Sequence, residues 1–175
     1  MVNGNNSIFA LSRMSNKLVN FQRQIINPSR DSPARFLEMR PTATLEKDDI
    51  KLDMEKLYFI LEADDRDLLG EIMVEEERYR SAIDAINERS RLHLHEVQPL
   101  LERAGFVLGG KYPFAQIETM LGQRLYSTIA QNTEQVISHV DSAVVSINLV
   151  ADKLTASLKK QYPDKKIISF VIPNE

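Results

Sequence analysis

Apolar residues recur at steps of three and four along most of the chain, which is the spacing of one face of an α-helix. The clearest example runs from Leu69 to Leu100 with the 3-4-3-4 spacing of coiled-coil a and d positions. Its positions are Leu69, Ile72, Glu76, Tyr79, Ile83, Ile86, Ser90, His93, Val97 and Leu100. Asp64 can cap the start of this helix, and Gly105 can end it. We therefore predict a long helix over residues 64–104.

A second stripe follows a turn over residues 105–113, which is rich in glycine and proline and therefore unsuited to a regular element. Its apolar positions are Ile117, Leu121, Leu125, Ile129, Val136, Val140, Ala143, Ile147, Val150, Leu154 and Leu158. We predict a helix over residues 114–162, with a bend where Gly122 or the pair Asn132-Thr133 weakens it. Since the connecting turn is short, the two long helices should form an antiparallel hairpin.

Two shorter helices are predicted before this hairpin. The first covers residues 7–26 and ends at Asn27, because a residue that precedes proline is disfavoured in the α region. Its apolar face consists of Ile8, Leu11, Met14, Leu18, Phe21 and Ile25. The prolines of residues 28–43 favour an irregular connection. The second helix is predicted over residues 45–62, because Thr44 offers a capping hydroxyl before acidic residues that suit the positive end of a helix dipole.

The C-terminal residues 166–172 contain β-branched and aromatic side chains and predict an extended tail. The other stretch of this composition, residues 106–108, lies at the turn of the hairpin. A helix of nearly fifty residues would separate the two stretches by ~70 Å. We therefore expect the tail to lie along the helices as extended chain, since pairing of the two stretches would require an antiparallel dimer.

These elements predict an all-α fold: an elongated antiparallel helical bundle with a long helical hairpin and a short extended C-terminal tail, in one domain over residues 1–175. With 43% hydrophobic residues, the chain can form a sizeable core. The absence of cysteine excludes disulfides, cysteine-based zinc sites, iron–sulfur clusters and cysteine nucleophiles. No uncharged apolar stretch is long enough to span a bilayer, so no transmembrane segment is predicted, and we expect a cytoplasmic protein.

Charge is distributed unevenly along the chain. Residues 1–44 carry six basic and two acidic side chains, whereas residues 45–104 carry nine basic and seventeen acidic ones. The acidic middle and the net charge of −3 oppose a broad phosphate-binding surface, so we expect no nucleic-acid partner. Residues 7–26 contain basic side chains and no acidic one, which is also typical of helices at a membrane surface. A peripheral membrane contact through this helix is an alternative to a role as a bundle helix.

Three residues are candidates for a metal site: His93, Glu96 and His139. His93 and Glu96 are three positions apart, a spacing that places both on one face of a helix. His93 and His95 are about 200° apart around the helix and cannot chelate the same ion. Further ligands would have to come from His139 or Glu76. The alternative is that one histidine lies in the seam between helices and the other in solvent.

No motif for catalysis or for a cofactor is found. Residues 138–141 include a serine, a histidine and an aspartate, but neighbours on one helix do not converge on a substrate. Phosphate-binding loops, dinucleotide-binding glycine motifs and nucleophile elbows are missing. Glu76 lies on the apolar stripe and is predicted to pair with Arg80 or Arg124. We expect no enzyme, no catalytic residue and no cofactor.

The run Glu-Val-Gln-Pro-Leu-Leu-Glu-Arg-Ala-Gly at residues 96–105 resembles stretches of bacterial proteins without an assigned activity, and it carries no residue role across. Long amphipathic helices that shorter helices cover only in part leave apolar stripes that recruit partners. We therefore predict a non-catalytic interaction or scaffold protein that self-associates or binds another protein. The alternatives are a ligand- or metal-sensing bundle and a peripheral membrane protein that uses residues 7–26.

Overall fold

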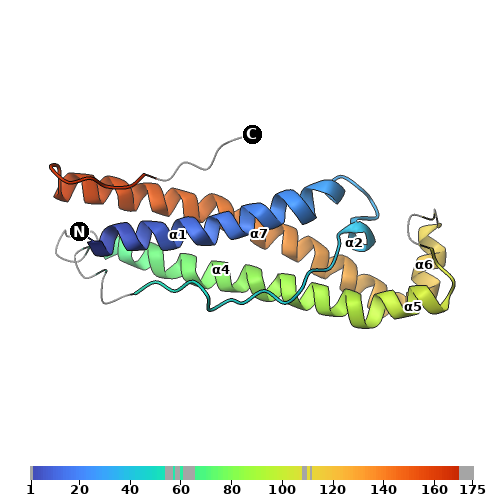
Figure 1. The fold of residues 1–175 in the computed structure, drawn as a ribbon. Coiled ribbons are helices and arrows are strands. Elements are labelled where there is room, and N and C mark those ends of the chain that lie inside the picture. Colours follow the sequence, from blue (N-terminus) through green and yellow to red (C-terminus); the bar gives the residue numbers. More distant parts are fainter. Residues whose placement is uncertain are drawn as a thin grey trace.

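Helices dominate the computed structural model of the chain (Figure 1), which describes residues 2–53, 57, 60, 66–107, 110 and 112–169. No strand occurs within these residues, so the all-α prediction is confirmed. Three long helices form the body of the molecule: α1 (Val2–Phe21), α4 (Arg66–Leu92) and α7 (Gln123–Gln161). They lie side by side along its long axis (Figure 1).

The helix α7 is central, because both α1 and α4 pack against it and run antiparallel to it. The facing apolar stripes form the main core, which includes Ile8, Leu11, Met14 and Leu18 of α1, Ile72, Tyr79, Ile83 and Ile86 of α4, and Val136, Val140, Ile147, Leu154 and Leu158 of α7. Gly4 lets α1 approach α7 closely, since a Cβ at this position would lie 2.6 Å from the Leu158 side chain.

The helix α1 continues into a π-helical turn (Gln22–Ile26) and a 3-10 turn (Asn27–Ser29). The helix predicted at residues 7–26 is therefore present, and it begins earlier than predicted. The proline of the 3-10 turn sits at its start, where a missing N–H is tolerated. The connection that follows is irregular apart from the short helix α2 (Arg35–Glu38).

The helix α4 likewise continues into a π-helical turn (His93–Val97) and then into α5 (Gln98–Arg103). Pro99 accounts for the wide turn, because its ring and its missing N–H are incompatible with a regular bond to the carbonyl four residues earlier. Gly105, with φ of +74°, follows the end of α5. This continuous run corresponds to the helix predicted at residues 64–104, of which the structure describes the part from residue 66.

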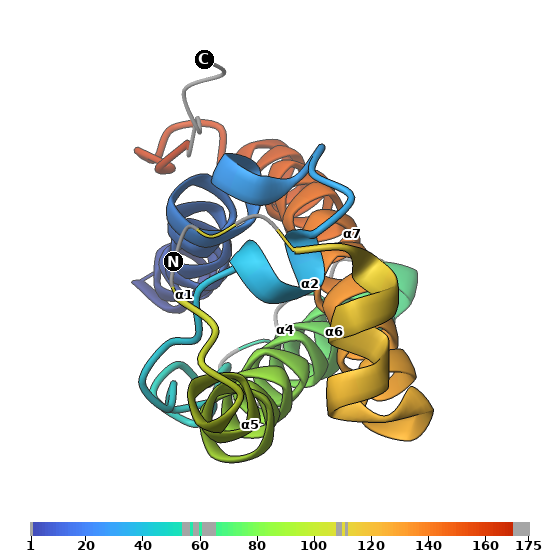
Figure 2. The ribbon, with the colours of Figure 1, turned by 90° about the vertical axis from the view of Figure 1, so that its right-hand side faces the viewer.

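The helix predicted at residues 114–162 is divided in two at Gly122. Because Gly122 has φ of +74°, which favours glycine, α6 (Phe114–Leu121) ends there and α7 begins. The helix α6 points away from the axis of α7 and closes one end of the bundle (Figures 1 and 2). Beneath it lies a second apolar cluster of Phe36, Leu92, Val97, Ile117, Leu121 and Ile129. The bend predicted at Gly122 is confirmed, whereas an unbroken helix is wrong.

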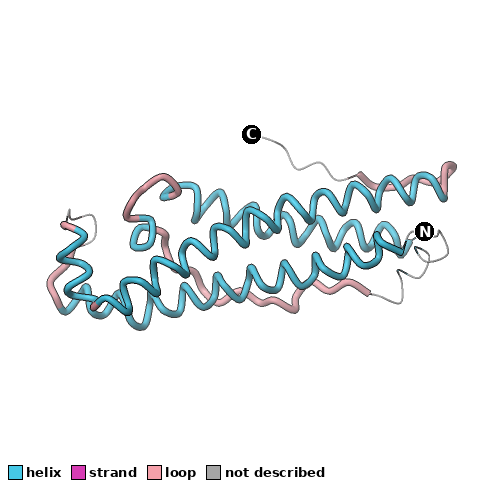
Figure 3. Tube along the Cα trace, turned by 180° about the vertical axis from the view of Figure 1, so that it is seen from behind, coloured by secondary structure: helices cyan, strands magenta, loops and turns pink. Residues whose placement is uncertain are grey.

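The helix predicted at residues 45–62 is wrong for the first part of this range. Residues 40–53 form an extended segment without regular secondary structure, which we call the strap (Figure 3). Buried and exposed side chains alternate over residues 50–53, which is the period of extended chain rather than of a helix. Later in the predicted helix, Leu57 and Ile60 are buried in the main core, and its other residues from 54 onward lie outside the described ones.

The tail predicted at residues 166–172 is described as far as residue 169. It is irregular and turns back along the bundle (Figure 1). The Asn5 side chain of α1 donates to the carbonyl of Lys166 at 3.4 Å and accepts from the N–H of Ile168 at 3.3 Å. The described part of the tail therefore lies along the helices, as predicted, and residues 170–172 lie outside the described ones.

Candidate functional site

The strap fills the groove between α1 and α4. Both helices pack on α7 rather than extensively on each other, and Figure 2 places the strap between them. Ile50 and Leu52 of the strap join the main core, as does Met39 just before it. The strap thus occupies the place that a fourth helix would take in a four-helix bundle.

Arg89 of α4 anchors the chain where it enters the strap. Its side chain is 1% exposed and donates to the main-chain carbonyls of Phe36 and Met39 and to the hydroxyl of Thr133 on α7. These carbonyls lie at the C-terminal end of α2, which favours a cation. Burial lowers the pKa of Arg89 to about 10, so the guanidinium stays charged at neutral pH. Arg89 therefore connects α2 to both long helices.

His93, one helical turn after Arg89, also contacts the short helix α2. Its Nε2 lies 3.3 Å from the carbonyl oxygen of Leu37, and its side chain is buried. Burial, together with the positive charge of Arg89, lowers the pKa of His93 to about 4. The ring is therefore neutral at neutral pH, and Nε2 must carry the proton in order to donate to Leu37.

Asn87 holds the middle of the strap by its main chain. Its Nδ2 donates to the carbonyl of Leu45 and its Oδ1 accepts from the N–H of Leu45, both at 2.8 Å. The carboxamide thus supplies the donor and the acceptor that a neighbouring β-strand would supply. Ser90 Oγ accepts from the N–H of Thr42 at 3.2 Å. Side chains of α4 therefore satisfy main-chain groups that have no secondary structure of their own.

Charged and phenolic side chains hold the second half of the strap to α4. The contacts are Lys47 with Asp84 at 3.0 Å, Asp48 with Arg80 at 3.3 Å, and Asp49 with the Tyr79 hydroxyl at 3.2 Å. Burial and the nearby carboxylate of Asp49 raise the pKa of Tyr79, so the phenol stays protonated and donates. The order of these contacts shows that the strap runs antiparallel to α4.

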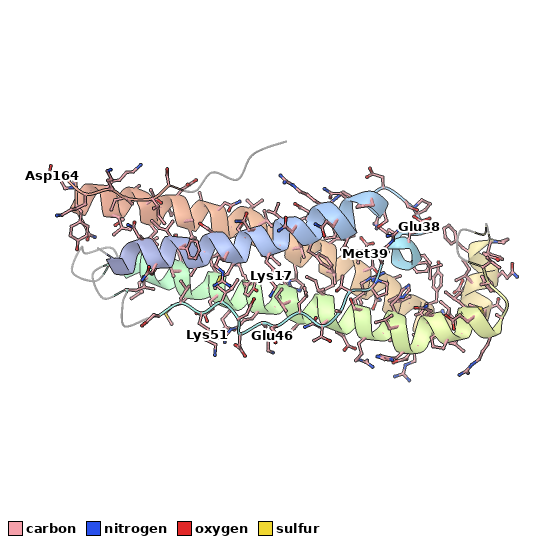
Figure 4. All side chains as sticks on the ribbon, viewed as in Figure 1. Lys17, Glu38, Met39, Glu46, Lys51 and Asp164 are labelled. Atoms are coloured by element: carbon pink, nitrogen blue, oxygen red, sulfur yellow. The ribbon has the colours of Figure 1, made fainter. Side chains whose placement is uncertain are left out.

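Lys17 contacts the strap from α1 (Figure 4). Its Nζ donates to the carbonyl of Glu46 at 2.7 Å and lies 3.0 Å from the carboxylate of Asp49. The ammonium also lies 5.8 Å from the centre of the Tyr79 ring, within the range of a cation–π contact. Lys17 and Arg80 thus place two cations against the two adjacent aspartates of the strap.

A second surface, on α4 and α7, lies uncovered in the described part of the molecule. It exposes Met73 and Val74 of α4 and Val145 and Leu149 of α7, with exposed fractions from 48% to 69%, and we call it the outer face. A shallow open cleft of about 450 Å³ adjoins it, lined by Met73, Val74 and Arg78 of α4 and His139 of α7, among others. Four of the large apolar side chains that the described residues expose therefore lie on α4 and α7.

Two polar contacts hold α4 and α7 together along this face. The hydroxyl of Ser146 donates to the buried carboxylate of Glu75 at 2.6 Å. Lys153 bonds Glu71 at 2.7 Å. These contacts fix the relative position of the two helices, so the outer face is a preformed surface rather than two independent helices.

The three candidate metal ligands have separate environments. His93 bonds the Leu37 carbonyl, Glu96 lies 3.6 Å from a guanidinium nitrogen of Arg91, and His139 lines the cleft beside the outer face. Among the described residues, no group of three or more histidine, aspartate or glutamate side chains could hold a metal ion. The candidates therefore do not form a site together in the described part of the chain.

The other residues considered for chemistry are in ion pairs. Asp141 accepts from Arg30 at 2.7 and 2.8 Å and from Gln22 at 2.7 Å, and the Arg30 guanidinium lowers the pKa of Asp141. It therefore faces α1 and its π-helical extension, and does not orient His139. Glu76 pairs with Arg80 at 3.0 Å, which confirms one of the two pairings predicted for it.

The residues that hold the strap, Arg89 and Asn87, were not predicted. Both nevertheless lie at helical spacing from buried positions: Arg89 is three residues after Ile86, and Asn87 is four residues after Ile83. A polar side chain on the flank of an apolar stripe is a signal for a buried hydrogen-bonding role. The acceptors could not be found in the same way, because they are main-chain carbonyls: those of Phe36 and Met39 belong to the predicted irregular connection, and that of Leu45 to the start of the predicted helix.

The helix considered for a membrane contact uses its apolar stripe inside the bundle. Ile8, Leu11, Met14 and Leu18 are fully buried, and Phe9 is the large apolar side chain that α1 exposes. No helix in the described part of the chain combines the length and the apolar character needed to cross a bilayer.

Fold and surfaces together define a class of protein: an all-α bundle of three long helices in which an extended strap replaces a fourth helix. We compared the chain with protein-family models, curated proteins and solved structures, and none of the three comparisons found a match.

Proposed function

We propose that the chain is a non-catalytic scaffold protein that self-associates through the outer face of α4 and α7. The observation that carries the proposal is the group of four large apolar side chains, each about half exposed or more, on two helices held in register. Exposed apolar groups of this kind on a preformed surface are typical of protein interfaces.

The outer face supports a second copy of the chain as the partner. Along α7, the exposed residues around Val145 and Leu149 include the uncharged Ser138, Ser142 and Ala156 and one acidic residue, Asp152. The nearby charges of Glu71 and Lys153 already neutralise each other. Two such faces can therefore meet mainly through uncharged side chains, which suits a two-fold contact because each surface meets a copy of itself.

The shape of the face also suits a two-fold contact. Val145 and Leu149 form an apolar ridge on α7, and the cleft with Met73 and Val74 lies on α4. A two-fold axis between two copies would place each ridge in the cleft of the other copy. This reciprocal arrangement would bury all four apolar side chains of both copies.

The mass of the protein in solution tests the proposal, measured by sedimentation equilibrium over a dilution series. We expect a dimer for the unmodified chain and a monomer for Val145→Glu/Leu149→Glu, because charges in a buried apolar contact are strongly unfavourable. The matched control is Phe9→Glu, which changes an equally exposed apolar residue on α1 and should leave the dimer intact. A monomeric unmodified chain at all concentrations, or a Val145→Glu/Leu149→Glu variant that remains dimeric, would refute the proposal.

A further inference from the structure

The strap is bound to the rest of the molecule in the way that a peptide is bound in a groove. No main-chain-to-main-chain hydrogen bond involves residues 40–52 in the described part of the chain. The polar contacts given above instead come from side chains of α1 and α4 to the main chain and to charged groups of the strap. The groove therefore carries side chains that bind the main chain of an extended segment at residues 42, 45 and 46.

We propose that the groove between α1 and α4 binds an extended acidic peptide segment of a partner protein, and that the strap is the resident segment with which this partner competes. The site is separate from the outer face, so this inference does not depend on self-association. It rests on the contacts of residues 42–49, where the strap is held mainly by polar groups.

The contacts define the chemistry of the partner segment. Asn87 binds one residue through both its N–H and its carbonyl, which any extended residue can offer. Leu45 is the half-buried residue at that position. Three residues further on, two consecutive aspartates meet Lys17 and Arg80. The groove thus favours an apolar residue followed, at a spacing of three and four, by two carboxylates.

The central part of the strap is the part that a competitor can replace. Residues 46–49 expose their side chains, and their ion pairs are partly exposed to solvent. Exposed ion pairs contribute little to stability. In contrast, Met39 at one end and Ile50 and Leu52 at the other are buried in the main core. Both ends can stay in place while the middle is displaced, so the bundle persists when the partner binds.

Fluorescence anisotropy of a labelled synthetic peptide of residues 42–49 tests the proposal with the full-length protein. We expect saturable binding that is stronger to Lys47→Ala/Asp48→Ala/Asp49→Ala, by about tenfold, because this variant weakens the resident strap and leaves the groove unchanged. The matched control is Glu88→Ala/Glu134→Ala, which removes two exposed ion pairs outside the groove and should not alter the affinity. Circular dichroism checks that each variant keeps its helix content.

Exchange of the charges between peptide and protein tests whether the peptide binds in the groove. A peptide with lysine in place of both aspartates should bind the unmodified protein at least tenfold more weakly, and it should be preferred by Lys17→Glu/Arg80→Glu. Absence of peptide binding to both the unmodified protein and the folded triple variant would overturn the proposal. An unchanged preference for the acidic peptide in the folded Lys17→Glu/Arg80→Glu variant would also overturn it, because the peptide would then bind elsewhere. If Lys17→Glu/Arg80→Glu does not fold, the proposal is decided by the peptide affinity of the triple variant relative to that of Glu88→Ala/Glu134→Ala. Equal affinities would overturn it.

Discussion

The groove side and the outer face of α4 differ in how the helix meets its surroundings. On the groove side, Asn87, Ser90 and Arg89 each bond the main chain of another segment, so that segment is placed by polar contacts at defined positions. On the outer face, Met73 and Val74 of α4 and Leu149 of α7 are apolar and about half exposed. The groove side therefore fixes the direction and register of a bound segment, whereas the outer face provides apolar contact area.

Main-chain hydrogen bonds and apolar area contribute to binding in different ways. Hydrogen bonds to a main chain select extended chain in one register, but each adds only about 0.5–1.5 kcal/mol to stability, since the chain loses bonds to water. Apolar area is non-directional and adds ~25 cal/mol for each Å² removed from water. The groove side is therefore suited to specific and exchangeable contacts, and the outer face to association between two preformed surfaces.

The largest change in the free energy of unfolding is expected for Arg89→Ala on the groove side. Loss of the guanidinium leaves the carbonyls of Phe36 and Met39 buried without their donor, and it leaves a cavity beside Thr133. We expect a loss of about 3–5 kcal/mol in the free energy of unfolding, measured with urea. Arg91→Ala is the control, because Arg91 is exposed on the same helix and its removal should leave the stability nearly unchanged. Equal losses would mean that the groove side is not held by buried contacts.

A smaller effect is expected from the titration of His93. Its pKa is about 4 in the folded state and 6.5 in the unfolded state, so the unfolded chain binds a proton first as the pH falls. The contribution of the neutral ring is fully present above pH 6.5 and is lost between pH 6.5 and 4. The loss amounts to about 2–3 kcal/mol, somewhat below the full value of the shift because the group is not completely enclosed.

Chemical denaturation at several pH values measures this effect. His93→Gln should remove most of the pH dependence between pH 6.5 and 4, because glutamine can still donate to the Leu37 carbonyl and does not titrate. His95→Gln is the control, since it makes the same substitution at an exposed position of the same π-helical turn. A pH dependence that persists in His93→Gln would assign it to carboxylates elsewhere in the molecule.

The same comparison explains which parts of the fold could be predicted from the sequence. The long helices were predicted because each repeats an apolar residue every three to four positions over many turns, and that period has one interpretation. The strap was not, because residues 44–49 combine a capping threonine with acidic residues, which also suits the start of a helix. The alternation that marks extended chain covers only residues 50–53, too few to decide from the pattern alone.

The candidate sites show a similar limit. His93 was noted as a position of the apolar stripe, and it is buried, but its acceptor is a main-chain carbonyl, and no side-chain pattern reveals a carbonyl. The outer face follows from the prediction that shorter helices cover the long ones only in part. Its particular residues depend on how α4 is rotated against α7, which the contact between Glu75 and Ser146 fixes in the folded molecule.

The smallest expected change in unfolding free energy tests whether the outer face contributes to the stability of a single copy. Leu149→Ala should change the unfolding free energy by no more than about 0.5 kcal/mol, because the side chain is 56% exposed and leaves no cavity. Leu154→Ala, five residues further along α7, should lower the unfolding free energy by about 2–5 kcal/mol, because Leu154 is fully buried. Both are measured with urea at low protein concentration, where self-association does not add to stability. A loss for Leu149→Ala close to that for Leu154→Ala would mean that Leu149 is packed within its own bundle, and the distinction between the two surfaces of α4 and α7 would then have to be abandoned.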